Sequence, residues 1–430
     1  MLPIYAGSLR VGEIRTGPEG LSIAYQPEWR AAAGAFPVSL SMPLSRPEWG
    51  AGIATPWLMN LLPEGEPLRA MTRALGVAAE DILGLIAASG RDLAGALSIS
   101  ALTEDPGFVP ITTDSQLERI INELPAKPFL AGDDGVAMSL AGAQDKLPVV
   151  LSDGVFAIPV NGAASTHILK PDNSRLPGSV QNEALCMVLA RRCGLDVADV
   201  TTGNAGGRSY LLVTRYDRIV SPAQVTRVHQ EDFCQALGRP PAAKYERSGA
   251  ATPGPSLADM FALVREYMTA RDITRLLDAV IFNIATGNVD SHAKNYSILL
   301  HPDRCELAPL YDLMSGLAWP NITRNHAQAI GGQRQGRYIF ARHWRRMADA
   351  AGLAGPAAVR RVAALAGRIL SELPAAVEEV ATMPAGRGML LETLAREIEA
   401  RARTVRTNAA LEDGASAEDD TPDSDIRYET

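Results

Sequence analysis

The stretch NVDSHAKNYSILL, residues 288–300, follows an apolar helical run and leads directly into a predicted strand. It places Asp290 and Asn295 five positions apart, with His292 and Lys294 between them. Asp290 alone is typical of a turn that ends a helix, and Asn295 alone is even more typical of a turn. The pair at this spacing, directly before a strand, needs a chemical explanation.

Phosphoryl transfer explains the pattern. The reaction needs a carboxylate that orients the attacking hydroxyl and oxygen ligands for Mg²⁺, and kinase catalytic loops supply an Asp and, four intervening residues later, an Asn. A second acidic ligand is expected where a short hairpin returns the chain to the metal, and Asp312 stands there, after CELAPLY. Carboxylate and amide oxygens suit Mg²⁺. His292 braces the loop or has a plain structural role, and Lys294 reaches a phosphate or is solvated.

Three further stretches fit a nucleotide site. THILK ends a predicted strand with Lys170, and Glu183 begins the helical run EALCMVLARRC, as in the Lys–Glu pair of kinases. Lys170 before Pro is otherwise an ordinary surface residue. SLAGAQDK, residues 139–146, has small residues that let backbone N–H groups approach phosphates, although it is not a GxGxxG motif. Residues 214–216 form the predicted hinge whose backbone meets adenine.

Composition describes an ordinary soluble globular chain. Its 430 residues are 47% hydrophobic and 21% charged, which predicts two or three domains. No apolar run approaches the roughly 20 residues that span a bilayer, and the first residues lack the pattern of a signal peptide. The four cysteines show no metal-ligand spacing, so buried thiols of a reduced, cytoplasmic protein are expected.

The net charge of −8 is unevenly distributed. Residues 407–430 hold eight acids and one Arg, so the remainder of the chain is nearly neutral. Residues 335–406 hold twelve Arg, seven acids and no Lys. This arginine-rich segment is either a solvated helical surface or a contact for DNA phosphates.

The order of predicted elements is that of an α+β protein with the two lobes of a protein kinase and an extra amino-terminal subdomain. FPVSLSMPL, residues 36–44, alternates with period two and predicts a strand, and residues 102–132 predict a connector. The predicted domains are 1–105, the amino-terminal α+β subdomain; 106–218, the strand-rich nucleotide-binding lobe with connector; 219–405, the helical catalytic lobe; and 406–430, an acidic disordered tail.

The chain resembles the HipA family of bacterial serine/threonine kinase toxins. The resemblance is carried by SLAGAQDKL, STHILKPD, QNEALCMVLARRCGL, VTRYDR, HQEDFCQALG, NVDSHAKNYSI and LAPLYDLMS. It runs in order from about residue 8 to about residue 345, and includes RVGEI, LSMPL, NLLPEG and GRDLAGALSI in the amino-terminal subdomain. These motifs are specific as a set.

The resemblance implies ATP- and Mg²⁺-dependent phosphorylation of a protein serine, with translation components such as aminoacyl-tRNA synthetases as targets. It implies that Asp290 accepts the proton, that Asn295 and Asp312 bind Mg²⁺, and that Ser139 is autophosphorylated to switch the enzyme off. The implied nucleotide contacts are Ala141, Gly142, Ala143, Gln144, Asp145, Lys146, Lys170, Thr214, Arg215, Tyr216, His292, Ala293, Lys294, Asn295, Tyr311 and Asp312, with Glu183 in support. Thr214 departs from the family, in which an acidic residue is more familiar.

The resemblance also implies a small DNA-binding antitoxin of the HipB type, operator DNA bound through that antitoxin, and nucleoid association in that complex. No membrane partner is expected. Two alternatives remain open: a phosphoinositide-like or small-molecule kinase, which also uses Asp-x-His-x-x-Asn, and a catalytically silent antitoxin partner. The acidic tail has no counterpart role in the family.

Overall fold

The computed structural model describes residues 1–101, 105–221, 224–247, 249 and 252–411. Its contacts divide the chain into two compact units. The amino-terminal unit comprises Met1–Pro171, Asn204–Pro241 and Ser297–Ala308, and the carboxy-terminal unit comprises Asp172–Gly203, Ala242–Tyr296 and Pro309–Thr430. The four predicted domains do not coincide with these units. Predicted domain 106–218 includes residues 172–203 of the carboxy-terminal unit, and predicted domain 219–405 includes residues 219–241 and 297–308 of the amino-terminal unit. The domain boundaries stay predictions. From residue 412 on, the predicted disordered tail lies outside the described residues.

The amino-terminal unit begins with an antiparallel sheet of strand order β4-β3-β2-β1-β5. Ile4, Ile14 and Ile23, one from each of three neighbouring strands, are fully buried in one hydrophobic core. The elements of this part are β1 (Leu2–Ala6), β2 (Leu9–Gly17), β3 (Gly20–Tyr25), α1 (Pro27–Ala31), β4 (Glu48–Trp49), α2 (Ala51–Met59), α3 (Gly65–Leu75), α4 (Ile82–Ser89) and β5 (Leu97–Ile99).

The strand predicted for residues 36–44 is wrong. The segment has only an isolated bridge between Ser39 and Met42. Its alternating apolar residues Val38 and Met42 are nevertheless fully buried. Ser39, a polar residue between them in the pattern, is fully buried as well. The alternation of residue types therefore marked neither a strand nor alternate burial, but an irregular segment packed into the core.

The second sheet of this unit contains β11, β9, β7, β8 and β6 in that order. The prediction of a connector over residues 102–132 is wrong in part, because β6 pairs with β8 and α5 is a regular helix. Leu117, Ile120 and Ile121 give α5 one buried face at helical spacing. The elements are β6 (Gly107–Ile111), α5 (Asp114–Glu123), η1 (Pro128–Leu130), β7 (Leu147–Ser152), β8 (Val155–Val160), β9 (His167–Pro171) and β11 (Arg208–Thr214).

Shorter strands complete the amino-terminal unit. The predicted strand pair after the NVDSHAKN motif is confirmed as β15 and β16, and β15 also pairs with β14. The elements are β12 (Arg218–Val220), β13 (Val225–Arg227), β14 (His229–Asp232), α7 (Phe233–Ala236), β15 (Ser297–Leu300) and β16 (Cys305–Leu307). The bounds of β10 (Val200–Ala205) and η2 (Pro241–Ala243) cross from one unit to the other.

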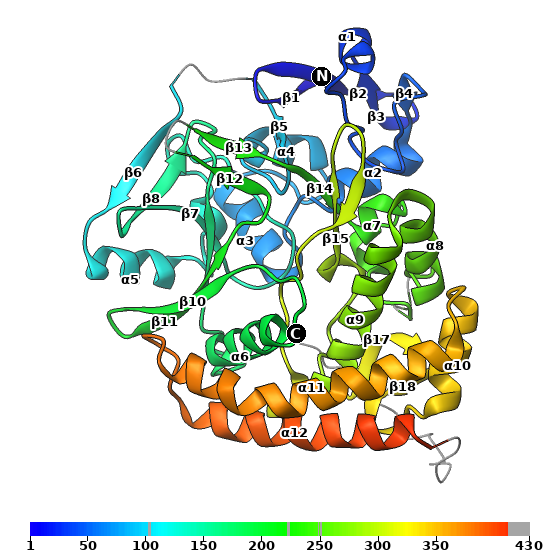
Figure 1. Ribbon diagram of the computed structural model, residues 1–430. Coiled ribbons are helices and arrows are strands. Elements are labelled where there is room, and N and C mark those ends of the chain that lie inside the picture. Colours follow the sequence, from blue (N-terminus) through cyan, green and yellow to red (C-terminus); the bar gives the residue numbers. More distant parts are fainter. Residues whose placement is uncertain (102–104, 222–223, 248, 250–251, 412–430) are drawn as a thin grey trace. The chain divides into compact units, whose positions relative to one another are not determined.

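The carboxy-terminal unit is mainly helical. Its long helices α11 and α12 lie side by side in Figure 1, and α11 also packs against α6, α9 and α10. The elements are α6 (Ser179–Arg192), α8 (Leu257–Tyr267), α9 (Ala270–Thr286), η3 (Ala293–Asn295), η4 (Gly316–Ala318), β17 (Asn325–Ile330), β18 (Gln333–Gln335), η5 (Gly336–Tyr338), α10 (Ala341–Ala350), α11 (Gly355–Ala381) and α12 (Met389–Ala409).

Candidate active site

Helix α9 delivers the NVDSHAKN loop. The helix starts with a capping box between Thr269 and Asp272 and ends at Gly287, whose φ of 73° is the left-handed conformation that glycine adopts without strain. A Cβ at Gly287 would lie 2.5 Å from the Leu317 side chain, so glycine is also required by space. The loop therefore leaves the helix at a fixed position and in a fixed direction.

The loop is held by hydrogen bonds around Asp290, which is 7% exposed. The Asp290 N–H donates to Oδ1 of Asn288 at 3.2 Å, and the Asp290 carbonyl accepts from the His292 N–H at 2.7 Å. Nδ2 of Asn295 donates to the same carbonyl at 2.9 Å. The loop thus closes on itself, and the predicted acceptor and the predicted metal ligand are directly linked.

This link also orients the Asn295 amide. Because Nδ2 of Asn295 donates its hydrogen bond to the Asp290 carbonyl, the other polar atom of the amide, Oδ1, is the one suited to a hard cation. An amide oxygen is a poor ligand for soft metals and a good one for Mg²⁺. The orientation of Asn295 therefore fits its predicted role.

Asp312 is brought to this loop by its neighbour. The Tyr311 hydroxyl donates to the Lys294 carbonyl at 2.7 Å, and the Leu310 N–H donates to the Asp196 carbonyl at 2.9 Å. Asp312 itself has a φ of 58°, an uncommon conformation for a residue with a side chain, and one that is frequent at functional sites. Asn295 and Asp312 are thus each adjacent in sequence to one partner of the same hydrogen bond.

Helix α6 supports the chain just beyond Asp312. Asn182 is fully buried and exchanges two hydrogen bonds of 2.8 Å with the backbone of Ser315. Glu183, the next residue, is 2% exposed in the same helix. Glu183 belongs to the carboxy-terminal unit and Lys170 to the amino-terminal unit, and their pairing stays a prediction.

In the amino-terminal unit the loop of residues 141–146 folds around an ammonium group. Nζ of Lys146 donates to the Ala141 carbonyl at 2.6 Å. Gly142 has a φ of 104°, and a Cβ there would lie 2.8 Å from that Nζ. The loop is anchored by the Glu64 N–H, which donates to the Gly142 carbonyl at 3.0 Å. A compact backbone loop around a cation is suited to oxyanions.

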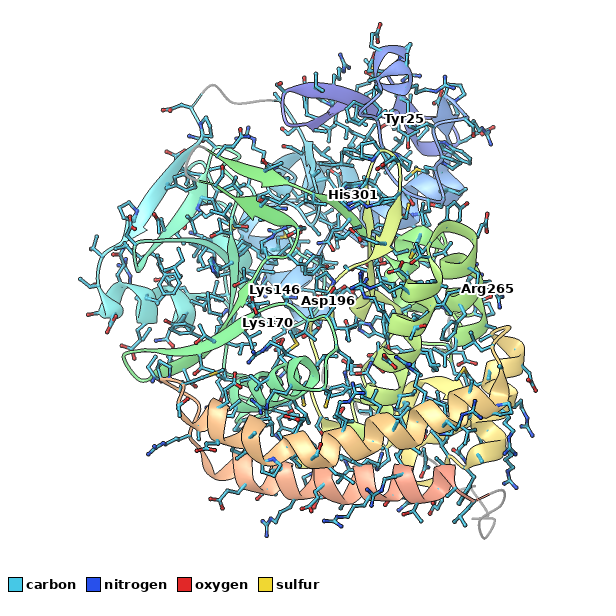
Figure 2. The ribbon with its side chains drawn as sticks, viewed as in Figure 1. Tyr25, Lys146, Lys170, Asp196, Arg265 and His301 are labelled. Carbon is cyan, nitrogen blue, oxygen red and sulfur yellow. The ribbon has the colours of Figure 1, made fainter. Side chains whose placement is uncertain are left out.

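Lys170 lies on the strand next to Lys146. Leu147 of β7 pairs with Leu169 of β9 in the antiparallel register, so Lys146 and Lys170 follow on from this pair at neighbouring positions. Figure 2 labels both side chains in the same region. Lys170 is 7% exposed. It is therefore not the ordinary surface residue that its position before Pro also allowed. Two cations at neighbouring positions, Lys146 directly before β7 and Lys170 within β9, favour the binding of phosphates.

In the predicted hinge, residues 214–216, both the backbone N–H and the side chain of Arg215 are bonded within the fold. The Arg215 N–H donates to the Thr166 carbonyl at 3.0 Å, so that group is engaged. The Arg215 side chain is buried and pairs with Asp217 at 2.8 Å. Burial would raise the pKa of Asp217, but the guanidinium groups of Arg215 and Arg218 hold it well below its usual value. An adenine contact would therefore use the backbone of Thr214 or Tyr216.

Ser139 is fully buried in the amino-terminal unit. Its hydroxyl donates to the Leu61 carbonyl at 2.9 Å, and its N–H donates to the Asp92 carbonyl at 3.2 Å. A phosphoryl group cannot be added to this hydroxyl in place. Modification of Ser139 requires the segment to leave its site.

Sequence reasoning missed several residues that hold the loop. Tyr245 donates its hydroxyl to Oδ1 of Asp290 at 2.6 Å. Beneath the loop, Nδ2 of Asn288 donates to Oδ1 of Asn283 at 3.1 Å, and Nδ2 of Asn283 donates to the Tyr296 hydroxyl at 2.8 Å. The two asparagines carried a signal, since both are polar residues of an otherwise apolar run, IFNIATGN. Tyr245 carried none.

Comparison with known proteins gives the family. The HipA N-terminal domain family matches residues 2–100, and the HipA-like C-terminal domain family matches residues 138–377. The serine/threonine-protein kinase toxin HipA of Shewanella oneidensis is 31% identical over 403 residues, which cover 89% of each chain. The chain belongs to the HipA family. Its resemblance to HipA in sequence motifs is therefore confirmed.

A solved structure and a second relative give the fold and the enzyme class. HipA of Shewanella oneidensis, solved in a complex with HipB and operator DNA, superposes with a TM-score of 0.84 at 27% identity, over 96% of this chain and 100% of that one. The predicted α+β, kinase-like HipA fold is thus confirmed. The putative kinase Y4mE of Sinorhizobium fredii is 40% identical over 364 residues, 82% of this chain and 86% of the relative. This chain, as a member of the HipA family with relatives named as kinases, is therefore a kinase.

Proposed function

We propose that this HipA-family kinase transfers the terminal phosphoryl group of ATP, with Mg²⁺, to a serine or threonine of a protein of the translation apparatus, such as an aminoacyl-tRNA synthetase. The observation that carries the proposal is the arrangement of Asp290, Asn295 and Asp312. Two hydrogen bonds, from Asn295 to the Asp290 carbonyl and from Tyr311 to the Lys294 carbonyl, tie these residues into one loop assembly.

In the proposed reaction Asp290 orients the attacking hydroxyl of the substrate and accepts its proton. Asn295 and Asp312 would hold Mg²⁺, which when bound neutralises charge on the phosphates. Lys146 and Lys170 would bind phosphate oxygens in the amino-terminal unit, with residues 141–146 supplying backbone N–H groups. Lys294, which is 6% exposed, would add positive charge beside Asn295.

Regulation and partners are part of the same proposal. Autophosphorylation of Ser139 would switch the kinase off by expelling its segment. A HipB-type antitoxin would bind the kinase and carry it to operator DNA, because the Shewanella relative was solved in such an assembly. The cytoplasm, with nucleoid association in the complex, is the proposed location. Within the described residues no helix is long and apolar enough to cross a membrane.

The arginine-rich segment gives only partial support for direct contact with DNA. Arg361 pairs with Asp278, and Nη1 of Arg368 donates to the Cys193 carbonyl at 2.7 Å, so both are used within the fold. Arg342, Arg346 and Arg403 are exposed, but Nη1 of Arg346 donates to the Gly331 carbonyl at 2.9 Å, and Arg403 pairs with Glu399. DNA contact through the antitoxin is therefore proposed in preference to contact through this segment.

Comparative phosphoproteomics tests the proposal. Bacterial cells expressing the wild type and Asp290→Asn at equal levels are compared for phosphorylated serines and threonines. We expect phosphosites on a translation protein that require Asp290. Phosphorylation confined to lipids or small molecules would favour the alternative kinase class, and toxicity that persists in Asp290→Asn without any phosphorylation would favour the silent antitoxin partner.

A further inference from the structure

Tyr245 lies directly against the predicted proton acceptor. Its hydroxyl donates to Oδ1 of Asp290 at 2.6 Å, which is the short distance typical of an O–H group bonded to a carboxylate. Asp290 is 7% exposed, and Tyr245 is partly buried. A contact of this length in a largely water-excluded place is stronger than the same contact at the surface.

The segment that carries Tyr245 is fixed on both sides. The carbonyl of Lys244 accepts from the Ala293 N–H of the loop at 3.1 Å. Glu246 donates its N–H to the Ala327 carbonyl at 3.2 Å and accepts the Ala329 N–H at Oε2 at 2.6 Å. Tyr245 is therefore presented from a short stretch attached both to the loop and to β17.

The backbone at Gly254 lies directly against the backbone of the segment that carries Tyr245. A Cβ at Gly254 would lie 2.0 Å from the Tyr245 carbonyl oxygen and 2.3 Å from that of Ala243. Glycine at this position allows the two backbones to touch. The hydroxyl of Tyr245 is thus placed by backbone contacts in addition to its own hydrogen bond.

The ring of Tyr245 has contacts of its own. It packs edge-to-face on His292 with ring centroids 5.2 Å apart, and Nζ of Lys244 lies 5.6 Å from its centroid. These contacts belong to the ring and persist in phenylalanine, which lacks only the hydroxyl. The functions of ring and hydroxyl can therefore be separated by substitution.

We propose that Tyr245 is the positioning residue of the reaction, and that its hydroxyl fixes the Asp290 carboxylate in the orientation that receives the substrate hydroxyl. A carboxylate otherwise rotates about its Cβ–Cγ bond. A donor at Oδ1 limits that rotation, so the approaching hydroxyl meets the carboxylate in one geometry. Tyr245 does not touch the phosphoryl group and acts only through Asp290. The inference rests on the proposed role of Asp290.

The test compares Tyr245→Phe, Tyr245→Ala and Asp290→Asn in the full-length protein, with phosphorylation of a translation protein that the wild type phosphorylates as the readout. Tyr338→Phe is the matched control, because it removes a phenolic hydroxyl whose ring lies under the Arg337 guanidinium in η5. The kcat, the KM for ATP, calorimetric ATP affinity and the thermal midpoint are measured for each. Loss of orientation at a reacting group lowers rates by up to about a hundred-fold.

We expect the kcat of Tyr245→Phe to fall about ten- to a hundred-fold, while its ATP affinity and its KM for ATP stay unchanged. The kcat of Tyr245→Ala should fall by a similar factor. Tyr338→Phe should match the wild type. A Phe variant with wild-type kcat beside an impaired Ala variant assigns the role to ring packing and overturns the inference, as does a Phe variant that fails to fold. If Asp290→Asn stays active, the proposed function itself fails.

Discussion

The Tyr311 hydroxyl donates a 2.7 Å hydrogen bond to the Lys294 carbonyl, and this contact joins the chain segments that carry Asp312 and Asn295. Asp312 follows a strand hairpin, and Asn295 follows helix α9. The link between the two segments therefore depends on a contact between Tyr311 and Lys294, which are 17 residues apart in the sequence. An oxygen-ligand site for Mg²⁺ needs such a cross-connection, because neither segment alone offers two ligands.

Asp312→Ala should weaken ATP binding only when Mg²⁺ is present. The substitution removes the one charged group among the two proposed ligands, and a charge-assisted interaction contributes about 1.5–3 kcal/mol. Titration calorimetry with and without Mg²⁺ measures the difference. We expect the Mg²⁺-dependent gain in affinity to shrink at least about ten-fold, and an undiminished gain would remove Asp312 from the metal site.

Lys170→Ala should lower ATP affinity about ten- to a hundred-fold, since it removes one charge-assisted contact to phosphate. Lys127→Ala is the matched control, because Lys127 is a surface lysine of the same unit that pairs with Asp133. Calorimetry on both variants gives the comparison. Equal ATP affinities for the two variants would exclude the proposed phosphate contact.

Ser139 should become phosphorylated on incubation with ATP and Mg²⁺, and ATP binding should be lost as the phosphate accumulates. The hydroxyl is buried against the Leu61 carbonyl, and a phosphate adds about −1.5 to −2 charge that this site cannot hold. The expelled segment precedes the loop of residues 141–146, which should then lose its form. Mass spectrometry and ATP titration in parallel check this.

Ser139→Ala should prevent that loss of ATP binding under the same incubation. The variant also removes the hydrogen bond to Leu61, so its starting activity is compared with that of the wild type. A Ser139-phosphorylated protein with normal ATP affinity would contradict the switch.

Glu231 should make the stability of the amino-terminal unit depend on pH. It is 1% exposed, its Oε1 accepts the Leu40 N–H at 2.7 Å, and burial raises its pKa to about 8, against the lowering effect of that hydrogen bond. A carboxyl group whose pKa is higher in the folded state than in the unfolded state stabilises the folded state. This stabilisation is fully present below the pKa of the unfolded state, which is about 4.3. That contribution to the free energy of unfolding is lost as pH rises through about 8.

Urea midpoints at pH 5, 7 and 9 check this dependence. Glu231→Gln stays neutral and can still accept the Leu40 N–H, so its stability should change less across this range. The pH dependence of the free energy of unfolding that Glu231→Gln removes is at most about 1.4 kcal/mol per pH unit. Glu80→Gln, at an exposed position of the same unit, is the control. Identical pH dependence in the wild type and Glu231→Gln would contradict the assignment.

The sequence predicted the parts of the fold that local patterns specify. The helix around Glu183, the helix before the loop and the hairpin after it are in place, because each combines periodic apolar residues with Gly or a turn at its ends. It failed where tertiary contacts decide. Residues 36–44 alternate in polarity but form no strand, and β6 pairs with a strand that begins 44 residues later than its own end.

The candidate site shows the same limit. Asp290 and Asn295 were predictable from spacing, since the geometry of one loop is local. Tyr245 was not, because it reaches Asp290 across 45 residues from an irregular segment without a motif of its own. The burial of the Arg215 side chain was also beyond the sequence, because its partner Asp92 lies far from it along the chain.

The most direct test of the account is phosphoryl transfer by purified Asp290→Asn, measured with labelled ATP and Mg²⁺ beside ATP affinity by calorimetry. Replacing the carboxylate by an amide keeps the shape of the side chain and removes the proton acceptor, whose contribution is about 10²–10⁴-fold in rate. We expect a loss of that size, with ATP still bound and the thermal midpoint unchanged. Phosphoryl transfer at near wild-type rate would contradict it.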